Sequence, residues 1–283
     1  MVKETEPSIP EKAFILQALK EGYRLDCRNK IEFRNIEINL GREFGHAEVQ
    51  LGSTRVFAKV SCEVTRPYEG RPTEGILVLN TEMSPMAIPS LEPGRPSEDE
   101  VLASRIIEKA LKRSDAIDTE GLCIIAGEKV WTIRIDIHFL DHDGNIVDAA
   151  CIAALTALSH FRRPDVTVVG TDVTIHSLES RNPVPLTIHH MPICVTFAFF
   201  DNGNLFVVDP LHREEQVREG DMTLTINSYQ EICAISKAGG IPLELKTIVE
   251  CSEIAASKVE NITALIKAAL KQDAQKRFVH YQI

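Results

Sequence analysis

The sequence predicts an α/β protein, of the α+β type, built from two mixed β-sheets with buried, alanine-rich helices between and around them. Residues 131–139 alternate apolar and polar side chains, which is the period of a strand with one buried face. A turn containing Gly144 follows, and residues 146–160 then carry apolar side chains on nearly every side, as a buried helix does. Both halves of the chain run strands first and an alanine-rich helix last, which predicts a duplicated fold.

Composition places the chain among ordinary globular proteins, with 283 residues of which 44% are hydrophobic and 25% charged. No apolar run is as long as a membrane span, and the polar N-terminus lacks the apolar core of a signal peptide. We therefore expect no membrane partner and a reducing compartment. The seven cysteines never form a CxxC pair, so we expect free, mostly buried thiols rather than disulfides or zinc ligands.

The net charge of −10 argues against a chain that binds nucleic acid on its own. Contacts to phosphate groups need clustered lysine and arginine side chains, and an acidic chain repels the same groups. Any contact with RNA is therefore expected to use a local basic patch or a more basic partner.

The first half is predicted to begin with a short helix and to continue as a strand-rich region. Ser8 and Glu11 have the spacing of a capping box, and Gly22 is expected to end this helix. A second helix is expected from the Ser97 cap to about Arg113. Its predicted inner stripe is Val101, Leu102, Ile106, Ala110 and Leu111. The segments that predict strands are 36–40, 48–51, 55–63, 75–83, 122–127 and 131–139.

The second half is predicted to repeat this order after a connector with one short strand. Residues 191–200 are apolar on both faces, which predicts a central strand. Further strands are expected at 205–210, 223–227 and 231–236, and two helical segments close the chain, one of them over 248–270. The expected divisions are 1–29 (N-terminal helix and RLDCR segment), 30–164 (first half), 165–187 (connector) and 188–283 (second half with the C-terminal helix).

The start of the buried helix is the first candidate functional site. Asn145 and Asp148 have the spacing of a capping box, and a helix N-terminus beside a glycine turn is a natural binding site for an anion. Whether this one holds phosphate is the main functional question that the sequence poses.

Four stretches resemble the RNase PH superfamily: RLDCR at 24–28, SLEPGR at 90–95, the strand–turn–helix at 135–155 and PVPLTIHHMPICVTF at 183–197. The sequence is most similar to the RNase PH-like ring subunits of the eukaryotic RNA exosome, from about residue 11 to about residue 270. The resemblance implies a duplicated RNase PH-like fold in a six-membered ring of related subunits, with RNA passing through the central channel. It also implies a location in the nucleus, including the nucleolus, and in the cytoplasm.

The resemblance also implies where an active member binds phosphate, and this chain departs from that pattern. Phosphorolytic members hold phosphate with a Gly-Thr-Arg-Ser/Thr run at the start of the buried helix. Here the run is replaced by Asn145, Ile146, Val147 and Asp148, a degenerate phosphate loop. Val147 stands where the arginine belongs, and Asp148 is expected to stabilise the helix dipole and to repel phosphate.

The family's second catalytic feature, a pair of carboxylates about six residues apart before the MP strand, is also degraded. The corresponding stretch is 179–186, where Glu179 falls near the first carboxylate and the second position falls on Pro185 or Leu186. His138 and His142 are four residues apart, but a strand end and a turn do not bring them to one face, so no metal site is expected. No cofactor is expected.

Three arginines are the candidates for RNA contact: Arg95 on a loop, and Arg105 and Arg113 on the following helix. The resemblance places the corresponding arginines of ring subunits near the channel. The alternative is a solvated helix face whose ion pairs contribute about 0–1 kcal/mol each.

These observations predict a catalytically silent subunit of the exosome core ring, which supports 3′→5′ RNA processing. The expected partners are sister RNase PH-like subunits, one of them as a heterodimer partner, S1/KH-type cap subunits, and RNA in the channel. Two alternatives stay open: an active phosphate-dependent 3′→5′ exoribonuclease, and a stand-alone RNA-binding module, which the net charge disfavours.

Overall fold

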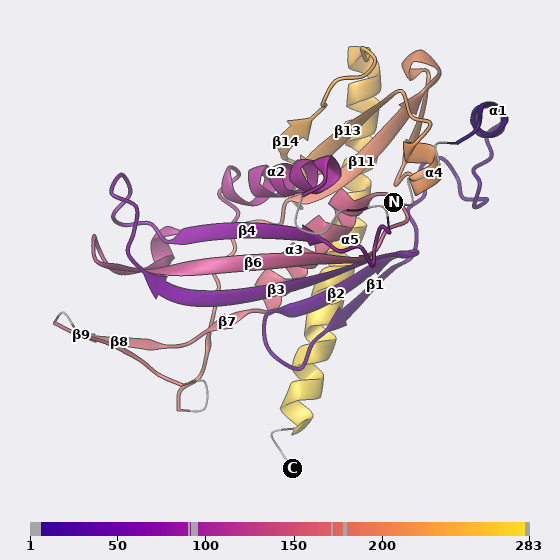
Figure 1. The fold of residues 1–283 in the computed structure, drawn as a ribbon. Coiled ribbons are helices and arrows are strands. Elements are labelled where there is room, and N and C mark those ends of the chain that lie inside the picture. Colours follow the sequence, from indigo (N-terminus) through magenta and orange to yellow (C-terminus); the bar gives the residue numbers. More distant parts are fainter. Residues whose placement is uncertain (1–6, 90, 92–95, 171, 178–179, 281–283) are drawn as a thin grey trace.

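Two β-sheets pack on a shared helix in the computed structural model, which describes residues 7–89, 91, 96–170, 172–177 and 180–280 (Figure 1). The helix, α3 (Ile146–His160), contacts strands of the first sheet and β11 (Ile193–Phe200) of the second. One hydrophobic core runs through both halves of the chain. The predicted α/β class is therefore confirmed.

The first sheet is mixed and has the strand order β1-β2-β3-β6-β4, with β5 also paired to β6. Strand β4 runs parallel to β6, and the other pairings are antiparallel. The bounds are β1 (Ile36–Leu40), β2 (His46–Leu51), β3 (Thr54–Thr65), β4 (Ile76–Met83), β5 (Cys123–Ile125) and β6 (Lys129–Asp141). All of the predicted first-half strands form.

The alternation along β6 has the predicted consequence. Its inward residues Trp131, Ile133, Ile135, Ile137 and Phe139 are all buried against α3 and the neighbouring strands. Helix α3 is buried over nearly all of its length, and its alanines let the helix backbone lie close to both sheets.

The second sheet has the order β12-β11-β13-β14 and is antiparallel in all of its described pairings, so only the first sheet is mixed. Its other strands are β12 (Leu205–Val208), β13 (Gly220–Ile226) and β14 (Ile232–Ser236). Every residue of β11 is buried, as expected for a strand that is apolar on both faces.

The connector contains more structure than the single predicted strand. Strands β8 (Val166–Val169) and β9 (Asp172–Ile175) pair as an antiparallel hairpin, which leaves the core of the molecule in Figure 1. Strand β7 (Arg162–Arg163), which follows α3 directly, forms a second short pair with β10 (Val184–Pro185). Each segment is too short to give a clear period in the sequence.

Two of the longer helices begin as predicted. Helix α1 (Ile9–Glu21) has the Ser8 and Glu11 capping box, ends at Gly22 in the left-handed conformation, and buries Ile15 and Leu19 against the second sheet. Helix α2 (Glu98–Lys112) is capped by the Ser97 hydroxyl, which accepts a hydrogen bond from the Glu100 amide (3.1 Å).

The end of the chain differs from the prediction. The two expected closing segments are one helix, α5 (Leu245–His280), which contacts β1, β11, β13 and α3. A short helix, α4 (His212–Glu215), follows β12, and 3₁₀ turns lie at Glu120–Leu122 and Asp201–Gly203. Among the described residues, no helix combines the length and apolar character needed to cross a bilayer.

The buried face of α2 is rotated from the predicted stripe. Leu102 is 44% exposed and Ile106 is half-buried, because both side chains border a cavity rather than the core. The fully buried residues are Ala103, Ile107, Ala110 and Leu111.

Candidate functional site

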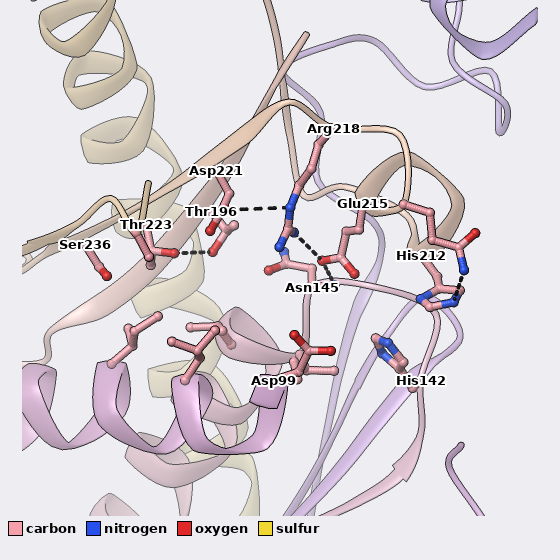
Figure 2. Close-up of a pocket in the computed structure, with 16 residues that line it drawn as sticks. Asp99, His142, Asn145, Thr196, His212, Glu215, Arg218, Asp221, Thr223 and Ser236 are labelled. Carbon is pink, nitrogen blue, oxygen red and sulfur yellow. Dashed lines mark hydrogen bonds and ion pairs between the residues drawn. The ribbon is translucent and has the colours of Figure 1, made fainter. Parts of the chain in front are cut away.

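A cavity of about 280 Å³ opens at the N-terminal end of α3, between residues of the two halves (Figure 2). One wall is formed by α2, the turn before α3 and the first residues of that helix. The other wall comes from β11, α4, β13 and β14. The lining residues are Asp99, Leu102, Ile106, His142, Asn145, Ile146, Val147, Thr196, His212, Glu215, Gln216, Arg218, Asp221, Thr223, Ser236 and Ala238. The resemblance implies an anion site at this helix start.

Gly144 lets the two halves approach each other below this cavity. It has a φ of +83°, and a β-carbon placed on it would lie 2.4 Å from the His212 nitrogen and 2.6 Å from the Pro210 carbonyl oxygen. Those atoms are backbone and cannot rotate away. The glycine is therefore required for the close packing of two chain segments, whether or not an anion binds.

The predicted capping box at Asn145 is wrong. Asn145 is the N-cap residue, but its backbone is left-handed (φ 53°) and its side chain makes no capping hydrogen bond. Its Nδ2 instead donates to Asp148 (2.9 Å) and to Asp209 (2.7 Å), while its backbone amide donates to Glu215 (2.9 Å). Tertiary partners from the second half have replaced the local capping bonds.

Asp148 does not line the cavity but lies buried behind the lining residues Asn145 and Thr196, so the predicted direct contact between its carboxylate and phosphate is also wrong. The carboxyl is fully buried and accepts hydrogen bonds from the Thr196 amide (2.9 Å), the Thr196 hydroxyl (2.8 Å) and Asn145. Burial raises the pKa of Asp148 to about 7 despite these bonds. The residue joins α3 to β11 and has a structural role.

Replacing Asp148 with asparagine is expected to stabilise the protein above pH 7. The pKa of the carboxyl is about 7 in the folded chain and 3.8 as its reference value, so its contribution to stability is present at low pH and lost as the pH rises from about 4 to about 7. An asparagine amide can accept from the Thr196 amide and donate to the Thr196 hydroxyl, which in turn donates to Thr223 (3.0 Å). The expected gain is on the order of 2–4 kcal/mol.

Urea unfolding at pH 5, 6, 7 and 8 measures this effect. The fall in unfolding free energy between pH 5 and 7 should be smaller in Asp148→Asn than in the unaltered protein. Glu63→Gln, which changes an exposed carboxylate on β3, should keep the full fall. An unchanged pH profile for Asp148→Asn would show that the buried carboxyl is not the titrating group.

The charges that do line the cavity are mostly negative. Its arginine, Arg218, faces two carboxylates, Glu215 (3.6 Å) and Asp221 (3.6 Å), and Asp99 stands on the opposite wall (Figure 2). Burial raises the pKa of Glu215 to about 7, and Asp99 contributes in the same direction. At the helix start, Ile146 and Val147 present apolar side chains to the same cavity.

The stretch predicted to hold the degraded carboxylate pair lies elsewhere. Val184–Pro185 pairs with the strand after the C-terminal end of α3, about 22 Å along the helix from Asn145. Glu179 lies outside the described residues. Two carboxylates of the second half that contact Asn145 at the helix start, Asp209 and Glu215, were not predicted from the sequence. Asp209 and Glu215 are six residues apart, which is the spacing of the family's carboxylate pair. That pair was expected before the strand at 191–200, whereas these two residues follow it.

Asp209 is the centre of a buried ionic network that ties the halves together. Its carboxylate accepts from Arg34 Nε (2.9 Å), Arg34 Nη2 (2.7 Å), the Arg34 amide (2.9 Å) and Arg28 Nη1 (2.8 Å). Arg34 also donates to the carbonyl oxygens of Asp143 (2.8 Å) and Gly144 (3.1 Å). Burial alone would raise the pKa of Asp209, but the hydrogen bonds and charge of Arg34 hold it below its usual value.

The RLDCR segment belongs to the same network. Arg24 makes a bidentate pair with Glu214 (3.1 and 2.6 Å), both side chains being fully buried, and donates to the carbonyl oxygens of Val208 and Asp209 (both 2.8 Å). Arg24 and Arg28, the two arginines of the RLDCR motif, therefore form ion pairs and hydrogen bonds within the chain. These bonds fix the position of residues 208–214.

The candidate RNA-contact residues are only partly described. Arg105 and Arg113 are exposed on and just after α2, and neither has an ion pair within the described part of the chain. Arg95 lies outside the described residues. Lys109, between them, donates to the Ile235 carbonyl oxygen of β14 (2.9 Å) and so contacts the second sheet instead. The role of the three arginines stays a prediction.

The two histidines considered together in the sequence are kept apart by their partners. His138 pairs with Glu82 (3.3 Å) and stacks on Phe57. His142 faces His212 across the cavity mouth, with ring centroids 4.7 Å apart. Burial, His212 and Arg34 together lower the pKa of His142 to about 4. The seven cysteines are free, as predicted, but only Cys151, Cys194 and Cys251 are buried, so the expectation that most of the thiols are buried is wrong.

Most of the chain matches the models of one known family. The family model described as "3′ exoribonuclease family, domain 1" matches residues 32–164, and the model of the same family's domain 2 matches residues 190–258. The chain belongs to this 3′ exoribonuclease family, the RNase PH family, as its resemblance predicted.

Within the family, the chain is similar to named exosome proteins along nearly its whole length. Exosome complex component rrp45 of Schizosaccharomyces pombe is 48% identical over 281 residues, which cover 99% of this chain and 97% of that protein. Human exosome complex component RRP45 is 52% identical over 276 residues, which cover 98% of this chain and 63% of that protein.

Solved structures agree with the predicted duplicated fold. A chain of the "archaeoglobus fulgidus exosome with RNA bound to the active site" superposes with a TM-score of 0.79 at 30% identity, covering 89% of this chain and 96% of that chain. A chain of the "Archaeal exosome core" superposes with a TM-score of 0.75 at 28% identity, covering 90% and 96%.

Proposed function

We propose that this chain is a structural, non-catalytic subunit of the core ring of an RNA exosome and supports 3′→5′ RNA processing and degradation there, in rRNA maturation and mRNA turnover. The whole-length similarity to exosome components supports the assembly. The observation that supports the absence of catalytic activity is the composition of the cavity at the start of α3. Ile146 and Val147 line it where a phosphate-binding site needs donors, and its carboxylates outnumber its single arginine.

The physical argument is electrostatic. Phosphate binding requires backbone amides and charge-assisted donors aimed at the anion. Each carboxylate about 4 Å from a phosphate oxygen costs on the order of 4 kcal/mol at an effective dielectric near 20. Arg218 already faces Glu215 and Asp221, so its charge is shared before any ligand enters.

The proposed partners are sister RNase PH-like subunits in a six-membered ring, S1/KH-type cap subunits and RNA in the channel, in the nucleus, nucleolus and cytoplasm. Two elements expose apolar side chains, which supports protein contacts at each. These are helix α1, at Ile9 and Phe14, and the β8–β9 hairpin, at Val168, Val169 and Ile175. The net charge of −10 favours neighbours that are more basic.

Native mass spectrometry and a phosphorolysis assay test the proposal together. The chain should assemble with sister subunits into a ring of one copy each, and the isolated chain should release no nucleoside diphosphate from oligo(A) with inorganic phosphate. Val147→Arg, which returns a guanidinium to the cavity wall, should not restore release while Glu215 and Asp221 remain. Asp148→Arg is a poorer probe because residue 148 is buried.

Two outcomes support the alternatives. Phosphate-dependent release by the unaltered chain that is lost in Glu215→Gln would identify an active exoribonuclease. Binding of oligo(A) by the isolated chain at physiological salt would identify a stand-alone RNA-binding module.

Charge reversal at Arg105 and Arg113 is expected to weaken RNA binding by the assembled ring. If both side chains contact phosphates, Arg105→Glu with Arg113→Glu should lower the affinity at least tenfold and reduce the salt dependence of binding by about two ions. Lys267→Glu with Lys271→Glu, the same total charge change at exposed positions of α5, is the control. Filter binding at several salt concentrations measures both. Equal losses in the control and the test variants would mean that only net charge matters.

A further inference from the structure

We propose that His142, His212 and Glu215 form a Zn²⁺ site that links the two halves of the chain at the mouth of the cavity. The three side chains offer ligand atoms that all lie within 4.8 Å of one another. His142 comes from the turn before α3, and His212 and Glu215 come from the first and last residues of α4 (Figure 2). No sequence pattern brings these residues together, because His142 is far from the other two along the chain.

The arrangement is close to a zinc geometry. Zinc–nitrogen bonds of about 2.0–2.1 Å place the ligand atoms of a tetrahedral site about 3.3 Å apart. None of the present separations exceeds 4.8 Å, so none needs to shorten by more than about 1.5 Å, which small side-chain rotations provide. The two rings already meet edge to face, with centroids 4.7 Å apart and an interplanar angle of 73°.

Neighbouring groups orient the ligands. The Asn145 amide donates to Glu215 Oε1 (2.9 Å) and fixes that carboxylate at the start of α3. Gln216 Nε2 lies 3.0 Å from His212 Nε2. Reversing this amide would place its oxygen against an Nε2–H, so that the lone pair of the neutral His212 ring would be on Nδ1.

One contact must give way for the ion to bind. The Gly144 amide donates a long hydrogen bond to His142 Nδ1 (3.3 Å), and a neutral imidazole has only one lone pair to offer. An ion at either ring nitrogen displaces this bond, which is weak at that length.

The ligand set suits zinc. Two imidazoles and one carboxylate are a common protein set for zinc, and they leave a fourth position for water, for which the cavity has room. The charges around the site have both signs. Arg218 lies 3.6 Å from Glu215 but equally close to Asp221, so it can retain a partner when Glu215 binds the ion.

Arg34 acts electrostatically on both His142 and Glu215, and Asp99 acts on Glu215. Asp143 lies 3.9 Å from Arg34, which offsets its charge, and Asp99 adds a negative charge from the end of α2. A divalent ion would thus replace the repulsion between Asp99 and Glu215 with attraction. Its role would be to cross-link the turn before α3 with α4.

Metal binding by the untagged chain tests the proposal. After treatment with EDTA and dialysis, titration calorimetry with Zn²⁺ should give one site per chain. Co²⁺ should bind at the same site with the intense visible absorption of a tetrahedral complex. His142→Ala, His212→Ala and Glu215→Gln should each lower the Zn²⁺ affinity at least tenfold.

The controls separate the site from folding and from surface histidines. His189→Ala removes an exposed histidine outside the cavity and should leave the affinity unchanged. Glu215→Gln keeps an oxygen to accept from the Asn145 amide, so circular dichroism of this variant should match that of the unaltered chain. Failure to bind one equivalent, or an equal loss of affinity in His189→Ala, would overturn the zinc site.

Discussion

Gly144→Ala is expected to destabilise the protein by at least about 3 kcal/mol and to abolish folding at 37 °C in a marginal background. The new β-carbon would lie 2.4–2.6 Å from backbone atoms of residues 210–212, far inside van der Waals contact. Relief requires the whole 209–215 segment to move away from the turn. That movement would also stretch the bonds from Arg34 to the Asp143 and Gly144 carbonyls. Urea unfolding measures the loss.

Gly127→Ala is the matched control for this change. Gly127 has nearly the same backbone conformation (φ +79°), but nothing lies within 4 Å of the position of its β-carbon. It therefore reports the conformational cost alone, about 1 kcal/mol. If Gly144→Ala cost no more than Gly127→Ala, the close approach of the two halves would not be rigid.

Asp209→Asn is expected to cost about 3–5 kcal/mol, because it leaves buried arginines without their counter-charge. The variant keeps the size of the side chain but turns one oxygen into a donor that faces Arg34 or Arg28. Arg34 is almost fully buried and cannot recover hydration. Urea unfolding at pH 7 measures the loss, and the m-value shows whether the halves still unfold together.

Asp165→Asn supplies the comparison for Asp209. Asp165 also pairs with an arginine, Arg181 (2.8 Å), but both side chains are substantially exposed, so the expected cost is about 0–1 kcal/mol. Similar losses for the two variants would mean that the Asp209 network is hydrated. Because the pKa of Asp209 is lowered in the fold, its contribution is present above pH 3.8 and is lost as the pH falls below that value.

The helices and strands that could be predicted from the sequence are those in which the spacing of apolar residues alone shows which face is buried. The alternation from Trp131 to Phe139 gave β6, and the all-round apolar run after Asn145 gave α3. The β11 strand was recognised because it is apolar on both faces. In each case a local pattern is sufficient, because one strand or helix face meets the core along its whole length.

The elements that could not be predicted depend on residues that are distant in the sequence. Asn145 has the residue type of an N-cap, yet Asp209 and Glu215 take its hydrogen bonds. The stripe on α2 is rotated because Leu102 and Ile106 border the cavity. The contact between His142 and His212 also could not be predicted, because the two residues are far apart in the sequence. The class of the fold was therefore predictable, whereas the composition of the candidate site was not.

Helix α3 closes the first half in sequence but covers the inner faces of both sheets in space. If the chain were divided in the connector, the first fragment would keep α3 and the second would lack the helix that covers its sheet. The second would expose the apolar face of β11 and aggregate unless the first were present. The two halves therefore share one hydrophobic core through α3, and neither is expected to fold as an independent module.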